Sequence, residues 1–288
     1  MKEIAVVSGK GGTGKSTISA AFASLAENKI MVDADVDASD LHLIFKPKDI
    51  KEGDYTSHKK AAINKDICTG CGLCRENCYF DAISPDFVVD PYLCEGCVAC
   101  QLVCPVNAIE MSQGTSGKWF IAETRFGMLT HAKLNTGEEN SGKLVTLIRN
   151  FAIKLSEEMN LDYVIIDGPP GIGCPVNSAV TGVAYAVAVI EPTLSGMHDF
   201  KRLIELAAQL QVKLGCVINK YDINLSMTRE IEQFCAGNNI ELLAKLPYTD
   251  EVIKANVAHQ TIVEYAPGSY ISRNIKELWN KVVERAEK

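Results

Sequence analysis

The sequence lacks the features of a membrane protein or a nucleic-acid-binding protein. Its longest apolar run, residues 183–190, has the length of a buried strand and falls well short of a membrane span. A basic stripe is absent, because 29 Lys and Arg are outnumbered by 36 Asp and Glu and the net charge is −7. A strand pattern begins almost at the first residue, which leaves no room for a signal peptide. We therefore expect a cytoplasmic protein that has no membrane span and binds no nucleic acid.

Cysteine, by contrast, is plentiful, with 11 in 288 residues. In a chain without a secretion signal, so many cysteines indicate metal binding rather than disulfides. Apolar residues make up 47% of the sequence and charged residues 23%, which is typical of a globular protein. The length suits one large domain or two of ordinary size.

A glycine-rich stretch at residues 8–17, SGKGGTGKST, predicts a nucleotide site. It follows a short apolar run and precedes a helical pattern, which is the context that a phosphate loop needs. Glycines let several backbone N–H groups point inward, and the start of the helix adds its positive end. Lys15 would reach the terminal phosphates, and the Ser16 hydroxyl would hold Mg²⁺. A glycine-rich turn without a ligand is the alternative. The predicted nucleotide-binding residues of the loop are Gly9, Lys10, Gly11, Gly12, Thr13, Gly14, Lys15, Ser16 and Thr17.

Two acidic strand ends extend this prediction. Residues 29–35 are typical of a strand that ends in Asp33 and Asp35, and residues 162–167 of a strand that runs into Asp167. Ligands bind beyond the carboxyl ends of parallel strands, so these carboxylates would face the phosphates. Asp167 has the pattern of a Walker B residue, whose carboxylate supports Mg²⁺ through water. A single aspartate at a strand end is usually only a cap, but these motifs beside a phosphate loop favour ATP hydrolysis.

The loop KGGTGKST, with Lys10 directly after the first glycine, resembles the deviant Walker A motif of the MinD/ParA family, which includes the nitrogenase iron protein and the Mrp-type iron–sulfur carriers. The resemblance implies a homodimer closed by ATP, in which Lys10 crosses to the partner's nucleotide like an arginine finger. A solvated loop lysine is the alternative. The resemblance also makes the stretch with Asp33 and Asp35 the first switch, in which Asp35 orients the attacking water and Asp33 holds Mg²⁺-bound water or the loop itself. Gly171, in the second switch after Asp167, would sense the terminal phosphate, and Asn219 would contact the adenine edge unless it is only a turn residue.

Eight of the cysteines form two runs with the spacing CxxCxxCxxxC, offset by 26 residues. The constant offset and the similar flanking sequences indicate an internal duplication. The runs resemble the bacterial two-cluster ferredoxin, which implies that the fourth cysteine of each run binds the other cluster. One [4Fe–4S] cluster would then be held by Cys68, Cys71, Cys74 and Cys104, and the other by Cys94, Cys97, Cys100 and Cys78. Two zinc sites or a disulfide knot are the alternatives, but zinc sites usually pair CxxC units at a different spacing.

The remaining cysteines lie outside these runs. Cys174 follows the second switch, where the nitrogenase iron protein has a cluster ligand, but we favour a buried structural thiol. The sequence leaves open whether it is a ligand. Cys216 lies in a strand pattern and Cys235 in a helical one, so both are expected in the core.

The order of elements predicts an α/β fold: a mostly parallel phosphate-loop sheet with helices on both faces, and an inserted small α+β ferredoxin-like domain. The ATPase domain would comprise residues 1–56 and 116–288, and the inserted domain residues 57–115. Residues 118–130 would resume the sheet as a strand or hairpin, and a helix at 271–288 would cover it.

Three functions fit these motifs. We favour an ATPase, slow without its partner, in which ATP gates electron transfer from the clusters to a redox partner. The alternative is an ATPase that assembles or delivers clusters to an apo-acceptor protein, and a MinD-like spatial organiser with a redox-sensing ferredoxin module fits less well. The cofactors would be ATP, Mg²⁺ and two [4Fe–4S] clusters. The predicted catalytic residues are Lys10, Lys15, Asp35 and Asp167, and the predicted Mg²⁺ ligands are Ser16, Asp33 and Asp167.

Overall fold

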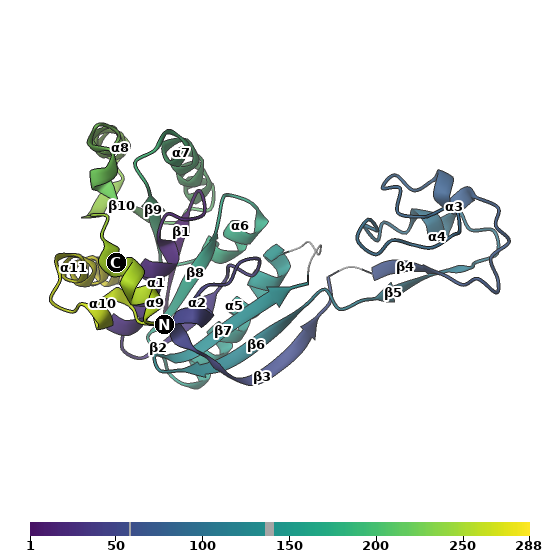
Figure 1. Cartoon of the computed structure of the whole chain (residues 1–288), viewed down its shortest axis with the longest axis horizontal. Coiled ribbons are helices and arrows are strands. Elements are labelled where there is room, and N and C mark those ends of the chain that lie inside the picture. The colour runs from purple at the N-terminus through teal and green to yellow at the C-terminus, as the bar shows by residue number, and fades with distance from the viewer. Residues whose placement is uncertain (58, 136–140) are drawn as a thin grey trace. The chain divides into compact units, whose positions relative to one another are not determined.

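The computed structural model describes residues 1–57, 59–135 and 141–288, and the chain forms two compact units (Figure 1). Unit 1 comprises Met1–Glu52, Trp119–Lys133 and residues 141–288. Unit 2 comprises the described residues of Gly53–Lys118, with Leu134 and Asn135. Unit 1 is therefore discontinuous in sequence, and unit 2 is inserted into it.

The main sheet has nine strands in the order β11-β10-β9-β1-β8-β2-β7-β6-β3. Its strands are β1 (Lys2–Ser8), β2 (Lys29–Asp33), β3 (Lys48–Tyr55), β6 (Gly117–Thr124), β7 (Gly127–Leu134), β8 (Tyr163–Pro170), β9 (Tyr185–Ile190), β10 (Leu214–Asn219) and β11 (Glu241–Leu246). Every neighbouring pair from β11 to β7 is parallel. The predicted mostly parallel sheet is confirmed, and the chain returns to it through the β6–β7 hairpin that the sequence also predicted.

Helices cover both faces of this sheet, as predicted (Figure 1). One face carries α1 (Lys15–Leu25), α10 (Ile262–Tyr265) and α11 (Tyr270–Glu287), and the other carries α5 (Ser141–Glu158), α6 (Cys174–Val180) and α7 (Leu194–Gln209). The remaining helices of unit 1 are α2 (Leu41–Phe45), the 3-10 turn Tyr221–Ile223, α8 (Leu225–Gly237) and α9 (Asp250–Val257). Among the described residues, none of the helices combines the length and apolar character that a membrane crossing requires.

Apolar residues at helical spacing bury α1 and α11 against each other and the sheet. Ile18 and Phe22 of α1 lie one turn apart and are buried, and the Phe22 ring lies 5.0 Å from the Trp279 ring of α11. Ser269 caps α11 by accepting a hydrogen bond from the Ser272 N–H. The C-terminal helix is thus part of the core, as the sequence predicted.

Because the central strands are parallel, their carboxyl ends meet at one edge of the sheet. The loops that follow β1, β2, β8, β9 and β10 therefore lie at the same edge. The glycine-rich stretch, Asp35 and Asn219 lie in these loops or directly at the strand ends that lead into them.

Unit 2 consists of two similar halves. Its elements are β4 (Lys59–Ile63), α3 (Leu73–Glu76), α4 (Ala99–Leu102) and β5 (Ile109–Gln113), and the two strands pair in antiparallel fashion. Gly72 and Val98, which precede the two helices, both have left-handed backbones, with φ of 85° and 61°. Asp81 and Asn107 repeat this likeness at φ of 50° and 52°. The sequence duplication is therefore also a duplication of backbone conformation.

Candidate functional site

The glycine-rich loop after β1 curls tightly before α1 begins. Gly12 and Gly14 have left-handed φ values of 79° and 90°. A Cβ at Gly14 would lie 2.2 Å from the Asn219 amide nitrogen and would have to adopt this left-handed backbone, so glycine is favoured there. With both switch regions, the loop lines an open cavity with about 1140 Å³ of empty space. The cavity is lined by Ser8, Gly11, Gly12, Thr13, Gly14, Lys15, Ser16, Thr17, Asp35, Asp37, Ala38, Asp40, Pro169, Pro170 and Pro175.

Lys15 lies at the centre of an acidic cluster beneath this loop. Its Nζ is 3.2 Å from Asp167 Oδ1 and 3.8 Å from Asp35 Oδ2. Asp33 and Asp167 are register partners on the adjacent strands β2 and β8. Ser19 Oγ also donates to Asp167 Oδ1, at 2.8 Å. The structure thus brings together the predicted lysine and all three predicted carboxylates. It also adds Ser19, which the sequence did not predict as a site residue because it lies inside the helical pattern of α1.

Burial shapes the charge of this cluster. Burial alone lowers the pKa of Lys15, but attraction to Asp167, Asp35 and Asp33 outweighs it, so the net shift of the pKa is upward. Burial and then repulsion by Asp167 raise the pKa of Asp33 to about 7. Burial also raises the pKa of Asp35 to about 6, although Lys15 opposes this. The pKa values of Asp33 and Asp35 therefore lie closer to neutral pH than those of ordinary aspartates.

Asp33 holds the first switch in this structure. Its Oδ1 accepts a hydrogen bond from the Asp35 N–H at 3.3 Å, and its Oδ2 accepts one from Ser39 Oγ at 2.6 Å. Of the two roles open to Asp33, these contacts match the one in which it holds the loop. Asp37 and Asp40, which the sequence pattern favours as solvated or capping residues, are exposed and line the cavity.

Two groups that the sequence predicts to contact a nucleotide, the Gly171 N–H and the Lys10 ammonium, are bonded within the chain. The Gly171 N–H donates to the Ser8 carbonyl at 2.9 Å. Lys10 Nζ lies 3.3 Å from Glu191 Oε2 and donates to Thr193 Oγ1 at 3.3 Å. No motif in the sequence marks Glu191, although it is a charged residue directly after the central strand β9.

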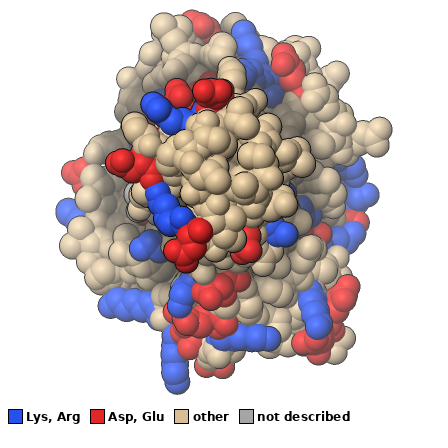
Figure 2. Space-filling model, turned by 90° about the vertical axis from the view of Figure 1, so that its right-hand side faces the viewer, with Lys and Arg blue, Asp and Glu red and all other residues tan. Residues whose placement is uncertain are grey.

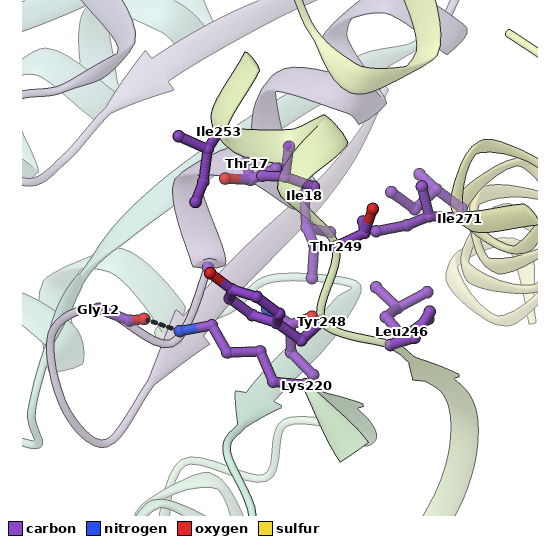
Figure 3. Close-up of a pocket in the computed structure, with 14 residues that line it drawn as sticks. Gly12, Thr17, Ile18, Lys220, Leu246, Tyr248, Thr249, Ile253 and Ile271 are labelled. Carbon is purple, nitrogen blue, oxygen red and sulfur yellow. Dashed lines mark hydrogen bonds between the residues drawn. The ribbon is translucent and has the colours of Figure 1, made fainter. Parts of the chain in front are cut away.

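A second, more apolar cavity adjoins the loop and contains about 760 Å³ of empty space. Figure 3 shows Tyr248, Ile253 and Ile271 around it, with the Lys220 side chain at its edge. Lys220 Nζ donates to the Gly12 carbonyl at 3.0 Å. Asn219, predicted to contact the adenine edge, lines this cavity and donates to the Thr13 carbonyl at 2.7 Å. A flat apolar base would fit this cavity beside the phosphate loop.

Unit 2 gathers its cysteines in two small cavities. One contains about 290 Å³ of empty space and is lined by Cys68, Cys71, Cys74 and Cys104, among other residues. The other contains about 350 Å³ and is lined by Cys78, Cys94, Cys97 and Cys100, among other residues. In each cavity, three thiols of one run therefore meet the fourth thiol of the other run.

Backbone donors and burial mark the two cavities further. The Ala82 N–H donates to Cys78 Sγ at 3.4 Å, and the Ala108 N–H donates to Cys104 Sγ at 3.2 Å. Burial raises the pKa of the Cys74 and Cys100 thiols, and neighbouring thiols of the same cavity add to the shift. No group of three or more His, Cys, Asp or Glu side chains within residues 1–57, 59–135 and 141–288 is arranged to hold a single metal ion.

The three other cysteines differ in exposure. Cys216 and Cys235 are buried, as predicted. The interpretation of Cys174 as a buried thiol is wrong, because it is exposed at the first residue of α6. Val176, Ala179 and Val180 of the same helix pack inward, whereas Cys174 lies on its exposed side.

The surface of unit 2 also exposes apolar side chains. Tyr79 is 91% exposed, and Leu102 is 80% exposed. Figure 2 shows an uncharged area near the centre of the face that it presents, with acidic and basic residues toward the edge.

Fold and site together define a phosphate-loop nucleotide-binding protein. The chain belongs to the CobQ/CobB/MinD/ParA nucleotide-binding domain family, which matches residues 4–262. The predicted MinD/ParA kinship is therefore confirmed.

Individual relatives agree with this assignment. An uncharacterized protein of Methanocaldococcus jannaschii is 38% identical over 286 residues, which cover 98% of this chain and 96% of that protein. The structure of the septum site-determining protein MinD with Mg-ADP from Pyrococcus horikoshii has a similar fold, with a TM-score of 0.61, 18% identity, and coverage of 98% of this chain and 95% of that one. A ferredoxin of Alicyclobacillus acidocaldarius is 56% identical over 39 residues, which are 12% of this chain and 50% of the ferredoxin.

Proposed function

We propose that this protein hydrolyses ATP and that nucleotide-driven changes of a homodimer are coupled to electron transfer by two [4Fe–4S] clusters to a redox partner. The observation that carries the proposal is the presence, in one chain, of a phosphate-loop site and two cavities that are each lined by four thiols. The proposal also makes unit 2 an inserted ferredoxin-like domain.

The phosphate-loop site fits MgATP. The inward N–H groups of the loop and the Lys15 ammonium would bind the phosphates. The Ser16 hydroxyl and Asp167 would hold Mg²⁺, directly or through water. Asp167 Oδ2 supports this assignment, because it is buried and accepts no hydrogen bond from the part of the chain that the structure describes. Asp35, which lies across from Lys15, would orient the water molecule that attacks the terminal phosphate.

The two cysteine cavities fit iron–sulfur clusters. Thiolates are the ligands that such clusters use, and four thiols around one small cavity are the number that a cubane needs. A cubane binds each thiolate through a different iron, so its four ligands need not converge on one point. Each cluster, when bound, would supply one-electron transfer. The N–H groups of Ala82 and Ala108 would stabilise the negative thiolates of Cys78 and Cys104 and so affect the reduction potentials.

An anaerobic redox titration, followed by EPR with and without MgATP, tests this function. We expect about eight irons per chain and a shift of midpoint potential on adding MgATP. The Lys15→Ala variant is the matched control, because it should keep its iron and lose the shift. Intact clusters whose potentials do not respond to MgATP in the wild-type chain would contradict ATP-gated electron transfer.

Delivery of a cluster to an apo-acceptor protein is the second candidate. Cys71 and Cys97, one at each cavity, are exposed, and this favours delivery because a thiol of the acceptor could replace either cysteine as a cluster ligand. Iron transferred to apo-ferredoxin only in the presence of MgATP would support delivery instead of electron transfer.

A further inference from the structure

Lys10 is held inside its own chain. Its Nζ lies 3.3 Å from Glu191 Oε2 and 3.3 Å from Thr193 Oγ1, in the loop between β9 and α7. In the proposed ATP-bound homodimer, the resemblance to the MinD/ParA family would place the same ammonium on the partner's nucleotide. The contacts with Glu191 and Thr193 are therefore a second, alternative position for Lys10.

Glu191 is shared between two lysines. Its Oε2 faces Lys10, and its Oε1 forms an ion pair with Lys220. Lys220 also donates to the Gly12 carbonyl of the phosphate loop, as Figure 3 shows. The Glu191 side chain is only 12% exposed, whereas each lysine side chain is 29% exposed. When Lys10 departs, Lys220 still neutralises the nearly buried carboxylate, so the departure leaves no unpaired charge behind.

The backbone around this ion pair has little room to move. A Cβ at Gly9 would lie 2.3 Å from Asp199 Cβ of α7, so the loop packs directly on that helix. A Cβ at Gly196 would lie 2.5 Å from the Glu191 carbonyl oxygen. Thr193 also caps α7 by accepting from the Gly196 N–H at 3.0 Å. Since both sides are fixed, Lys10 can leave by rotating its own flexible side chain.

We propose that Glu191 and Thr193 form a resting site for the Lys10 ammonium, and that Glu191 thereby sets the affinity of the ATP-bound dimer by competing with the partner's nucleotide for Lys10. The inference rests on the proposed ATP-dependent dimer. Lys220 weakens the resting site because it shares the charge of Glu191. Glu191 is a positioning residue in this scheme, since it acts on the nucleotide only through Lys10.

Two substitutions on the same ion pair test the resting site. Glu191→Gln removes the charge that holds Lys10, so the dissociation constant of the dimer should fall about threefold or more. Lys220→Met leaves Glu191 to Lys10 alone, so the dissociation constant should rise by a similar factor. Sedimentation velocity of the full chain, under anaerobic conditions with saturating MgATP and in an Asp35→Asn background that slows hydrolysis, measures both. Lys10→Ala is the control that removes the competing group itself.

The opposite signs separate competition from a structural role. Both substitutions break the Glu191–Lys220 ion pair, so a merely structural pair would shift dimerisation in the same direction in both variants. If the two substitutions changed the dissociation constant in the same direction, or if neither changed it more than twofold, the resting site would be overturned. The proposed dimer would still stand in that case, provided that the wild-type chain dimerised with MgATP. A wild-type chain that stayed monomeric with MgATP would overturn the proposed dimer and the resting site with it.

Discussion

The crossing of the fourth cysteine between the two cavities can be tested by counting iron in alanine variants. Cys104 follows Cys94, Cys97 and Cys100 along the chain, yet it lines the cavity of Cys71. With about four irons per cluster, Cys104→Ala should keep about four of eight. The double variant Cys71→Ala/Cys104→Ala removes two thiols of the same cavity and should also keep about four irons. The double variant Cys97→Ala/Cys104→Ala removes one thiol from each cavity and should keep no iron.

Iron per chain, measured after anaerobic purification and checked by EPR, gives the result directly. Cys174→Ala is the matched control, because Cys174 lines neither cysteine cavity in the part of the chain that the structure describes, and its iron content should be unchanged. The reasoning is refuted if Cys71→Ala/Cys104→Ala loses all its iron while Cys97→Ala/Cys104→Ala keeps about four. That outcome would mean that each run binds its own cluster.

Three further outcomes are expected in unit 1. Burial and Asp167 raise the pKa of Asp33 from 3.8 to about 7, so the nucleotide-free folded protein binds a proton that the unfolded chain releases. Its free energy of unfolding should therefore fall by up to about 4 kcal/mol between about pH 4 and about pH 7, from about three units at 1.36 kcal/mol each, and denaturant titrations should show a smaller fall in Asp33→Asn. Asp35→Asn should lower the rate of ATP hydrolysis about 100-fold or more in a phosphate-release assay, while nucleotide binding persists. Gly14→Ala should weaken MgATP binding about tenfold or more by calorimetry, because its Cβ would lie 2.2 Å from the Asn219 amide nitrogen at a φ of 90°; wild-type affinity would contradict the close approach.

Local patterns carried most of the fold and much of the site. The glycines of residues 8–17 and the apolar spacing of Ile18 and Phe22 predict a loop and a helix from neighbouring residues alone. The cysteine runs and their offset likewise predict two similar halves, which the left-handed backbones of Gly72 and Val98 repeat. The loop, the helical spacing and each cysteine run are short, contiguous stretches, and hydrogen bonding and side-chain periodicity act over such distances.

Contacts between distant segments could not be predicted in this way. Lys10 and Thr193 are 183 residues apart, and they meet because β1 and β9 are neighbours in the sheet. The exposure of Cys174 likewise depends on which side of α6 packs inward. The sequence by itself determined the phosphate loop, the acidic strand ends and the two cysteine runs. Only the tertiary structure decided that Glu191 holds Lys10, because the partner of a charged side chain depends on which strands lie side by side, and strand order is not written in any local pattern.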